Sequence, residues 1–457
     1  MKCSTAILIV CCIVTVSCRK SQEQNSNTSK ERSPLKAPGP LALVLAPHVG
    51  EGHLDKQIRM LQAQIRSGRP AATKVEQLGW LYVAKARESF DPGYYKLAEQ
   101  CAACLESGQE REPVTPAFVV HRSPEAMFLR GHVLHNLHQF KQAEGVATQL
   151  VSLRGAPVDF GLLGDALMEQ GQLDGAVAAY QRMADLKPDL HAFVRAAHVR
   201  WLKGDLSGAL ELAQTAARCI SLRDSDTAAW VLTRLASYQF QSGAIVPARN
   251  SCEQALAFRH DYPPALLLSG RMLLAEGVTQ RAVALLLRAA ELVPLPEYQW
   301  AVAEALEANG EKAEAQRVEG ELRHTGSASD PRTFALFLST RGEDPALALR
   351  LAKEELENRQ DVFTHDAVAW ALAGVGRIGE ARAHLDLALA EGTQDARLFF
   401  HAAVLASRAD DPEQTAKWAA KASQLKLLLL PSEHAALSRL AASQFPNRSF
   451  GLAGAEK

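Results

Sequence analysis

Residues Pro157–Leu190 read PVDFGLLGDALMEQGQLDGAVAAYQRMADLKPDL, and they indicate the architecture most clearly. Apolar residues recur at helical spacing in both halves, and Gly171 separates the two halves. Gly164 and Ala176 are small residues, which allow two helices to approach closely. Glycine at 171 lets the chain reverse direction. The stretch therefore predicts two helices joined by a tight turn.

The same pattern returns about every 34 residues, ten times between Ala71 and Leu425. The small residue of the first helix recurs as Gly79, Gly131, Ala197, Ala236, Gly270, Ala303, Ala335 and Ala369. The alanine of the second helix recurs as Ala143, Ala209, Ala248, Ala282, Ala315 and Ala381. The turn glycine recurs as Gly204, Gly243, Gly277, Gly310, Gly342 and Gly376.

This period resembles the tetratricopeptide repeat (TPR), a helix-turn-helix unit of 34 residues. The resemblance implies an all-α fold, an α-solenoid forming a right-handed superhelix of about ten TPR repeats. In such an array each repeat contacts only its neighbours, so we expect one elongated domain. Two units depart from the pattern: the first carries extra residues around Asp91–Gly93, and the last has an offset near Asp410–Pro412.

The charge balance indicates no nucleic-acid partner. Fifty Lys and Arg residues stand against 51 Asp and Glu residues, which leaves a net charge of −1. We also find no GxSxG, HExxH or P-loop pattern, so we expect no enzymatic activity, no cofactor and no small-molecule substrate.

The first 18 residues, MKCSTAILIVCCIVTVSC, indicate export. One basic residue precedes an apolar run from Ala6 to Val16, which is too short to span a bilayer. The end of the run resembles a bacterial lipobox and implies lipidation of Cys18, with Arg19 favouring the outer membrane, facing the periplasm. Ordinary secretory cleavage after Ser17 is the alternative, and it would give a secreted or soluble periplasmic protein.

The remaining chain divides by composition. Residues 19–50 are polar and rich in proline toward the end, which predicts a disordered tether, although the apolar segment Leu41–Ala46 could instead pack on the first repeat. Residues 51–70 predict an N-terminal capping helix, because terminal repeats need a partner. The solenoid takes residues 71–425, and residues 426–457 predict a C-terminal capping helix and a disordered tail.

Two motifs suggest chemistry but fit the repeat better. Cys101 and Cys104 form a CxxC, and His132, His135 and His138 follow on the next helix, a set that could hold zinc. We favour the interpretation that the cysteines pack in a helix interface and the histidines are exposed, and we expect no metal. The GxGxxG at 374–379 follows a helix instead of a strand, so we interpret it as a repeat turn and not as a dinucleotide site.

The resemblance also implies a binding surface, because the first helix of each TPR lines the concave face. This register places five of the six tryptophans on that face, and aromatic residues are favoured at binding hot spots. The residues that we expect to line a partner-binding groove are Trp80, Phe128, His132, His135, Asp165, His198, Trp201, Trp230, Phe240, Arg271, Trp300, Glu304, Glu307 and Trp370.

The sequence therefore predicts a scaffold of the bacterial cell envelope that binds a peptide or protein partner in the concave TPR groove. The membrane contact would come from the N-terminal lipid anchor. A chaperone-like carrier or assembly factor for outer-membrane or secreted polypeptides is the alternative.

Overall fold

The computed structural model describes residues 39–68, 72–107 and 123–444. Contacts divide the chain into two units, residues 1–39 and 40–457, and all described helices lie in the second. The predicted signal segment with Cys18, the tether up to residue 38 and the tail from residue 445 lie outside the described residues.

The second unit begins with two helices that precede the repeats, α1 (Pro40–Val44) and α2 (His53–Arg66). Val44 is fully buried beside Ile58, and its carbonyl accepts a hydrogen bond of 2.7 Å from the Tyr82 hydroxyl. Within the predicted tether, residues 40–44 are helical, and Val44 packs on the first repeat as the alternative for Leu41–Ala46 proposed. The apolar side chain of Val44 outweighs the polar composition around it because the first repeat offers it a place to pack.

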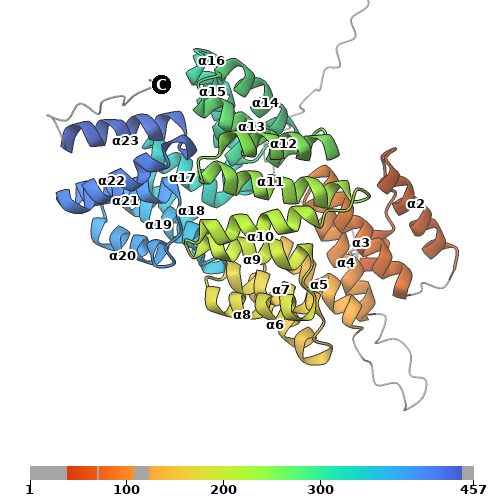
Figure 1. The fold of residues 1–457 in the computed structure, drawn as a ribbon. Helices are drawn as coiled ribbons and strands as arrows, with labels where there is room; N and C mark the ends of the chain where they lie inside the picture. Colours follow the sequence, from red (N-terminus) through yellow and green to blue (C-terminus); the bar gives the residue numbers. More distant parts are fainter. Residues whose placement is uncertain (1–38, 69–71, 108–122, 445–457) are drawn as a thin grey trace, which may run out of the picture. The chain divides into compact units, whose positions relative to one another are not determined.

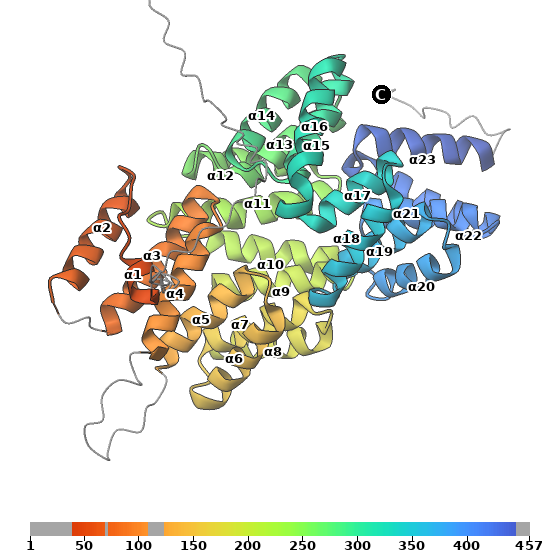
Figure 2. The same ribbon diagram turned by 180° about the vertical axis from the view of Figure 1, so that it is seen from behind.

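Ten helix pairs follow within the described residues, and each pair packs side by side (Figures 1 and 2). We number them as repeats 1 to 10 and call the first helix of each pair the A helix. The pairs are α3 (Ala72–Ser89) with α4 (Gly93–Ser107), α5 (Pro124–Asn136) with α6 (Phe140–Leu153), α7 (Pro157–Glu169) with α8 (Leu173–Leu186), α9 (Leu190–Leu202) with α10 (Leu206–Arg218), α11 (Ser225–Gln241) with α12 (Ile245–Phe258), α13 (Pro263–Ala275) with α14 (Thr279–Leu292), α15 (Pro296–Ala308) with α16 (Lys312–Ser329), α17 (Pro331–Arg341) with α18 (Pro345–Asn358), α19 (Val362–Gly374) with α20 (Ile378–Leu389), and α21 (Ala396–Arg408) with α22 (Pro412–Gln424).

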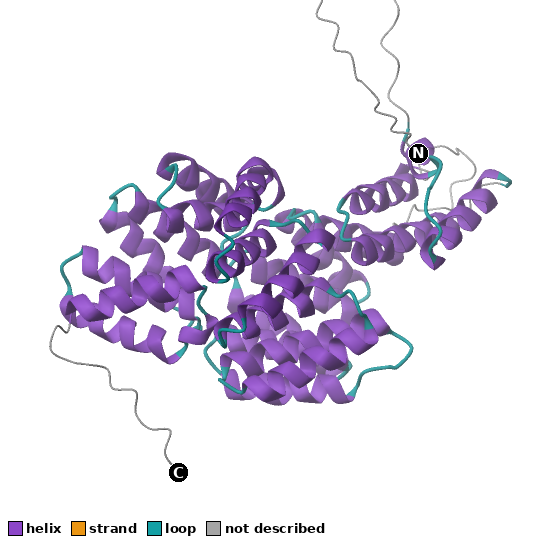
Figure 3. Cartoon of the chain, turned by 90° about the horizontal axis from the view of Figure 1, so that it is seen from above, coloured by secondary structure: helices purple, strands orange, loops and turns teal. Residues whose placement is uncertain are grey.

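A short 3-10 helix η1 (Lys426–Leu428) and a last helix α23 (Pro431–Gln444) follow repeat 10. Figure 3 shows that loops alone join the helices, and the described part of the chain contains no strand. The predicted all-α solenoid is confirmed. Among the described helices, none combines the length and the apolar character that a membrane span requires.

The turn inside each of these ten pairs contains a residue with a left-handed backbone at an equivalent position, and the turn of repeat 8 contains a second one, Asp344. The φ angles of the ten equivalent residues lie between 55° and 88°, at Phe90, His138, Gly171, Gly204, Gly243, Gly277, Gly310, Gly342, Gly376 and Asp410. A positive φ is sterically costly for residues other than glycine, which explains why glycine recurs at seven of the ten positions. The GxGxxG is thus a repeat turn, as predicted, because Gly376 holds this position.

The two irregular units have simple structural causes. The A helix of repeat 1 has 18 residues where most others have 13, so the extra residues lengthen the helix before the turn at Phe90. Repeat 10 shows no offset, because Asp410 takes the place of the turn glycine. The buried Thr415 takes the place of the alanine, and its hydroxyl donates to the carbonyl of Asp411 at 2.7 Å.

Small residues allow the two helices of a pair to approach, as the sequence predicted. A Cβ at Gly164 would lie 2.3 Å from the ring of Tyr180 in the partner helix, which is closer than atoms can pack. Ala176 and Ala197 are fully buried at their equivalent positions.

Contacts between distant repeats depart from the expectation that each repeat contacts only its neighbours. The backbone N–H of Gln360, after repeat 8, donates to the carbonyl of Glu169 in repeat 3 at 3.0 Å. The hydroxyl of Thr393, before repeat 10, donates to the carbonyl of Leu202 in repeat 4 at 2.5 Å. The path of the repeats therefore returns on itself within residues 40–444, an arrangement that a 34-residue period does not encode.

Candidate partner-binding cavity

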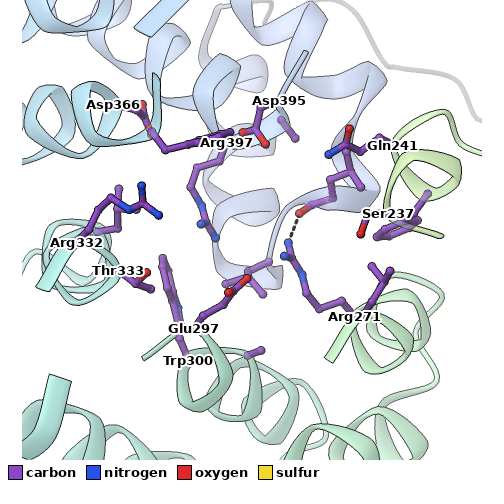
Figure 4. A pocket seen from close by; sticks show the side chains of 18 residues that line it. Ser237, Gln241, Arg271, Glu297, Trp300, Arg332, Thr333, Asp366, Asp395 and Arg397 are labelled. Atoms are coloured by element: carbon purple, nitrogen blue, oxygen red, sulfur yellow. Dashed lines mark hydrogen bonds between the residues drawn. The ribbon is translucent and has the colours of Figure 1, made fainter. Parts of the chain in front are cut away.

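Six successive A helices, those of repeats 5 to 10, surround one cavity of about 290 Å³ (Figure 4). Its lining residues are Ser237, Phe240, Gln241, Leu268, Arg271, Glu297, Trp300, Ala301, Arg332, Thr333, Leu336, Phe363, Asp366, Asp395, Ala396, Arg397, Leu428 and Leu430. The A helices thus share one inner face, as the TPR register implied. Leu428 and Leu430 come from the segment after the last repeat, which contributes to the wall.

Three arginines from three different repeats point toward this cavity in Figure 4. Arg332 pairs with Asp361 at 3.1 Å, and Arg397 pairs with Glu433 at 2.6 Å. Arg271 pairs with no carboxylate of the described residues, and its Nη2 donates to the carbonyl of Leu428 at 2.6 Å. Burial and the nearby Arg397 guanidinium lower the pKa of Arg271. The cavity therefore holds one cation whose charge is not neutralised by direct contact.

Two aspartates and one glutamate also line this cavity. Asp366 accepts from Nδ1 of the buried His401, whose nitrogen lies 2.9 Å from the nearer carboxylate oxygen. Asp395 caps α21 by accepting from the backbone N–H of Leu398 at 3.0 Å, and burial raises the pKa of its carboxyl group. Glu297 is exposed. Both signs of charge thus face the cavity, which suits a ligand with several polar groups, such as a peptide.

Trp300 forms an aromatic wall of the cavity. Its ring lies under the guanidinium of Arg397, 4.8 Å from the ring centroid, and its Nε1 donates to Glu304 at 3.1 Å. Burial raises the pKa of Glu304, although Ser432 and Arg341 oppose that rise. Of the predicted site residues, Phe240, Arg271 and Trp300 line this cavity, and Glu304 lies behind Trp300 and binds Ser432.

A second cavity of about 330 Å³ lies where repeats 3 and 4 meet repeats 8 and 9. Arg332 and Phe363 line both cavities. The predicted site residue His198 lies here, and its Nδ1 contacts the Arg234 guanidinium at 2.6 Å. Burial and Arg234 lower the pKa of His198 well below its usual value, so this imidazole is neutral.

The predicted residues of repeats 1 and 2 form a separate aromatic cluster. The ring of Trp80 lies 5.6 Å from Phe128 and 5.5 Å from His132. Burial, with a contribution from Arg87, lowers the pKa of His132 to about 3. His135 packs edge-on against Phe140 at 5.3 Å, apart from this cluster.

Asp165 belongs to an internal ion pair instead of an open groove. Arg195 donates to both of its carboxylate oxygens, at 2.8 and 2.6 Å, and the Tyr180 hydroxyl donates at 2.8 Å. Burial acts against ionisation, but Arg195 holds the pKa of Asp165 below its usual value. Both oxygens of this carboxylate therefore accept hydrogen bonds from side chains of the same chain.

The TPR register predicts that at least three of the five tryptophans are exposed in the groove, whereas three of the five are buried. Trp201 is 7%, Trp300 1% and Trp370 6% exposed. The ring of Phe363 stacks on Trp201 at 5.7 Å, and His401 of the next repeat stacks on Trp370 at 4.1 Å. Of these tryptophans only Trp300 lines one of the two cavities, because other repeats cover the rings of Trp201 and Trp370.

The remaining predicted residues differ in surroundings. Trp230 is half-buried beside Ile220. Glu307 is exposed, and Arg341 donates to it at 3.2 Å. Neither residue lines one of the two cavities.

The cysteine and histidine set does not assemble. Cys101 is fully buried, and desolvation raises the pKa of its thiol well above the usual value, while burial raises that of Cys104 to about 11. His138 stands in the turn and stacks on Phe140. No group of three or more potential metal ligands occurs among the described residues.

Sequence reasoning missed Arg332, Arg397, Asp366 and Asp395. The register that selected Arg271 also admits Arg332 and Arg397, so the signal for these two was present. It was overlooked because the three arginines stand far apart in sequence and form no charged run. Asp366 stands at the same register position as Arg332 and therefore carried the same signal, whereas Asp395 precedes its helix and carried none.

No family model and no curated protein matches the sequence. Among solved structures, the chain is similar to a thermophilic TPR protein of Thermus thermophilus, with 22% identity, 43% of this chain and 98% of that one covered, and a TM-score of 0.34. It is similar to a tetratricopeptide repeat protein from Parabacteroides merdae, with 17% identity, coverages of 55% and 98%, and a TM-score of 0.31. For the human IFIT1 dimer with PPP-AAAA, the identity is 13%, the coverages are 85% and 94%, and the TM-score is 0.46. The ten helix pairs themselves establish the TPR-like α-solenoid.

Proposed function

We propose that this chain is a non-catalytic scaffold of the bacterial cell envelope that binds a protein or peptide partner on the inner face of repeats 5 to 10. The observation that carries the proposal is the convergence of six A helices on one cavity lined by arginines, carboxylates and an indole. Repeat arrays typically bind along the surface that their stacked units share. Mixed charge and an aromatic wall suit a peptide, whose backbone and side chains offer both donors and acceptors.

A charge reversal tests this assignment without disturbing the core. Glu297 lines the cavity and is exposed, so Glu297→Lys changes the charge of the inner face and leaves the helix packing intact. The matched control is Glu253→Lys, an exposed glutamate on α12, outside the cavity lining. Affinity capture from envelope extracts should lose its partner with the first variant only. Equal capture of the partner by both variants would show that the cavity is not part of the binding surface.

The alternative function, a carrier of outer-membrane or secreted polypeptides, uses the same surface less selectively. Quantitative mass spectrometry of the captured material separates the two functions. One partner at a stoichiometric amount supports the scaffold, whereas many clients at low amounts support the carrier.

The proposed location rests on the sequence Thr15–Cys18. We propose that Cys18 is lipidated and holds the chain at the outer membrane, facing the periplasm, with a secreted or soluble periplasmic protein as the alternative. A Cys18→Ala variant should move from the membrane fraction to the soluble fraction. Retention of that variant in the membrane fraction would contradict the lipid anchor.

A further inference from the structure

The segment Lys426–Glu433 crosses from the end of the solenoid to the inner face of repeats 6 and 7. A helix that only caps an array packs on the last repeat. Here Leu428 and Leu430 line the cavity, and the polar contacts reach residues 128 and 157 positions away in the sequence. Figure 4 shows this segment's ribbon beside Arg271 and Arg397.

Three contacts hold the segment. Arg271 donates to the carbonyl of Leu428 at 2.6 Å. Glu304 accepts from the backbone N–H of Ser432 at 2.9 Å and from its hydroxyl at 2.5 Å, which caps the first turn of α23. Arg397 pairs with Glu433 at 2.6 Å.

Two of these contacts involve the peptide backbone, and that decides what else could bind there. Arg271 donates to a backbone carbonyl, and Glu304 accepts from a backbone N–H at a helix N-terminus. Neither hydrogen bond therefore depends fully on the side chains of the bound segment. Selectivity comes from the two leucines in the cavity and from the carboxylate opposite Arg397. The contacts describe a short binding motif: leucines, then a helix start bearing serine and glutamate.

Beyond its first turn, α23 is lightly packed. Among residues 431–442, only Glu433 and Leu437 have buried side chains. Release of α23 exposes Leu437, and release of the preceding residues also exposes Leu429 and Leu430, which belong to the same core cluster. A displacing partner must therefore bury leucines of its own in their place.

We propose that the segment Lys426–Glu433 is an internal occupant of the partner-binding inner face, beside the cavity whose wall it helps to form. A partner segment of the same chemistry, leucines leading into an acidic helix start, displaces it. This inference rests on the proposed function and adds the class of partner and its regulation. The competing internal segment lowers the apparent affinity for a partner by the fraction of molecules in which the cavity is open.

The test uses the full-length chain and a fluorescein-labelled peptide of residues 426–444. Ser432→Ala combined with Glu433→Lys removes the hydroxyl contact with Glu304 and places a like charge beside Arg397, while the cavity itself stays unchanged. The matched control is Glu413→Lys in the first turn of α22, where the glutamate is exposed. Fluorescence anisotropy should show that the double variant binds the peptide roughly tenfold or more tightly than wild type or the control. Addition of Arg271→Ala should abolish that gain.

A second measurement covers the case in which the double variant fails to fold, which circular dichroism would show. In wild type, a saturating amount of the same peptide, made with ¹³C and ¹⁵N so that its fragments differ in mass from those of the protein, should raise deuterium uptake in residues 431–442 of the protein and leave α21 protected. Absence of this rise, or a folded double variant that does not bind the peptide, overturns the inference. If the peptide tests fail but partner capture still depends on Glu297, the proposed function stands without this inference. If the peptide tests fail and partner capture does not depend on Glu297, the proposed function is contradicted as well.

Discussion

Substitution of Gly204 by alanine should destabilise the chain more than substitution of Gly243. Both glycines are turn residues with nearly equal φ angles, 79° and 81°. An alanine Cβ at 204 would lie 2.5 Å from the carbonyl oxygen of Gly392, at the contact between repeat 4 and the start of repeat 10. At Gly243, no described atom lies within 4 Å of the added Cβ. The pair therefore separates backbone strain from the contact between distant repeats.

The size of the difference follows from the structure. Left-handed strain costs about 1–2 kcal/mol for an alanine, and it is common to both variants. Gly204→Ala must also move two backbones apart, which adds about 1–3 kcal/mol as overpacking does in a core. The same movement weakens the hydrogen bond from Thr393 to the Leu202 carbonyl, which is worth about 1 kcal/mol. The expected excess is about 2–4 kcal/mol.

Urea denaturation of both variants, followed by circular dichroism, measures this excess. Hydrogen exchange should also rise in residues 390–395 of Gly204→Ala and stay unchanged in Gly243→Ala. Equal losses of stability in the two variants would refute the conclusion that distant repeats stabilise each other.

Three other changes test the packing of the predicted site residues. Trp300→Ala should lower the free energy of unfolding by about 3–5 kcal/mol. Trp230→Ala should lower it clearly less, because the ring of Trp230 is half-buried. Chemical denaturation that shows the larger loss for Trp230→Ala would contradict this difference in burial. Asp165→Asn should cost about 1.5–3 kcal/mol because it removes the counter-charge of the half-buried Arg195 guanidinium, and a thermal melt like that of wild type would contradict a stabilising role of the pair. The pKa of His132 is lowered to about 3 in the folded chain, so the imidazole of the unfolded chain is protonated first as the pH falls below 6.5. The free energy of unfolding should therefore drop by about 1–2 kcal/mol between pH 7 and pH 5. Denaturation at both pH values measures this drop, and His132→Gln should reduce it.

The period of the sequence predicted the helix pairs and their turns because those features are local. A small residue such as Gly164 contacts the partner helix of its own repeat, and the left-handed turn residue acts within a few positions. Where glycine is missing, Phe90 and Asp410 still adopt the turn, because the packing of the two helices outweighs the strain of a positive φ.

The exposure of the candidate site could not be predicted in the same way. The register places Trp201 and Trp300 on the inner face, but it does not show which residues cover that face. Phe363 reaches Trp201 only because repeat 9 returns to repeat 4, and Arg397 lies over Trp300 only through the curvature of the later repeats. Such contacts depend on small rotations accumulated over several repeats, and no single repeat encodes them.

Site-specific photocrosslinking tests the central claim, partner binding at the inner face of repeats 5 to 10, most directly. A photoreactive amino acid at position 297 places the probe at the exposed edge of the cavity, and the same residue at position 253 serves as the control outside the cavity lining. In intact cells, irradiation should attach a partner protein at position 297 and none at position 253. Crosslinks at position 253 alone, or the same products at both positions, would contradict binding at the inner face.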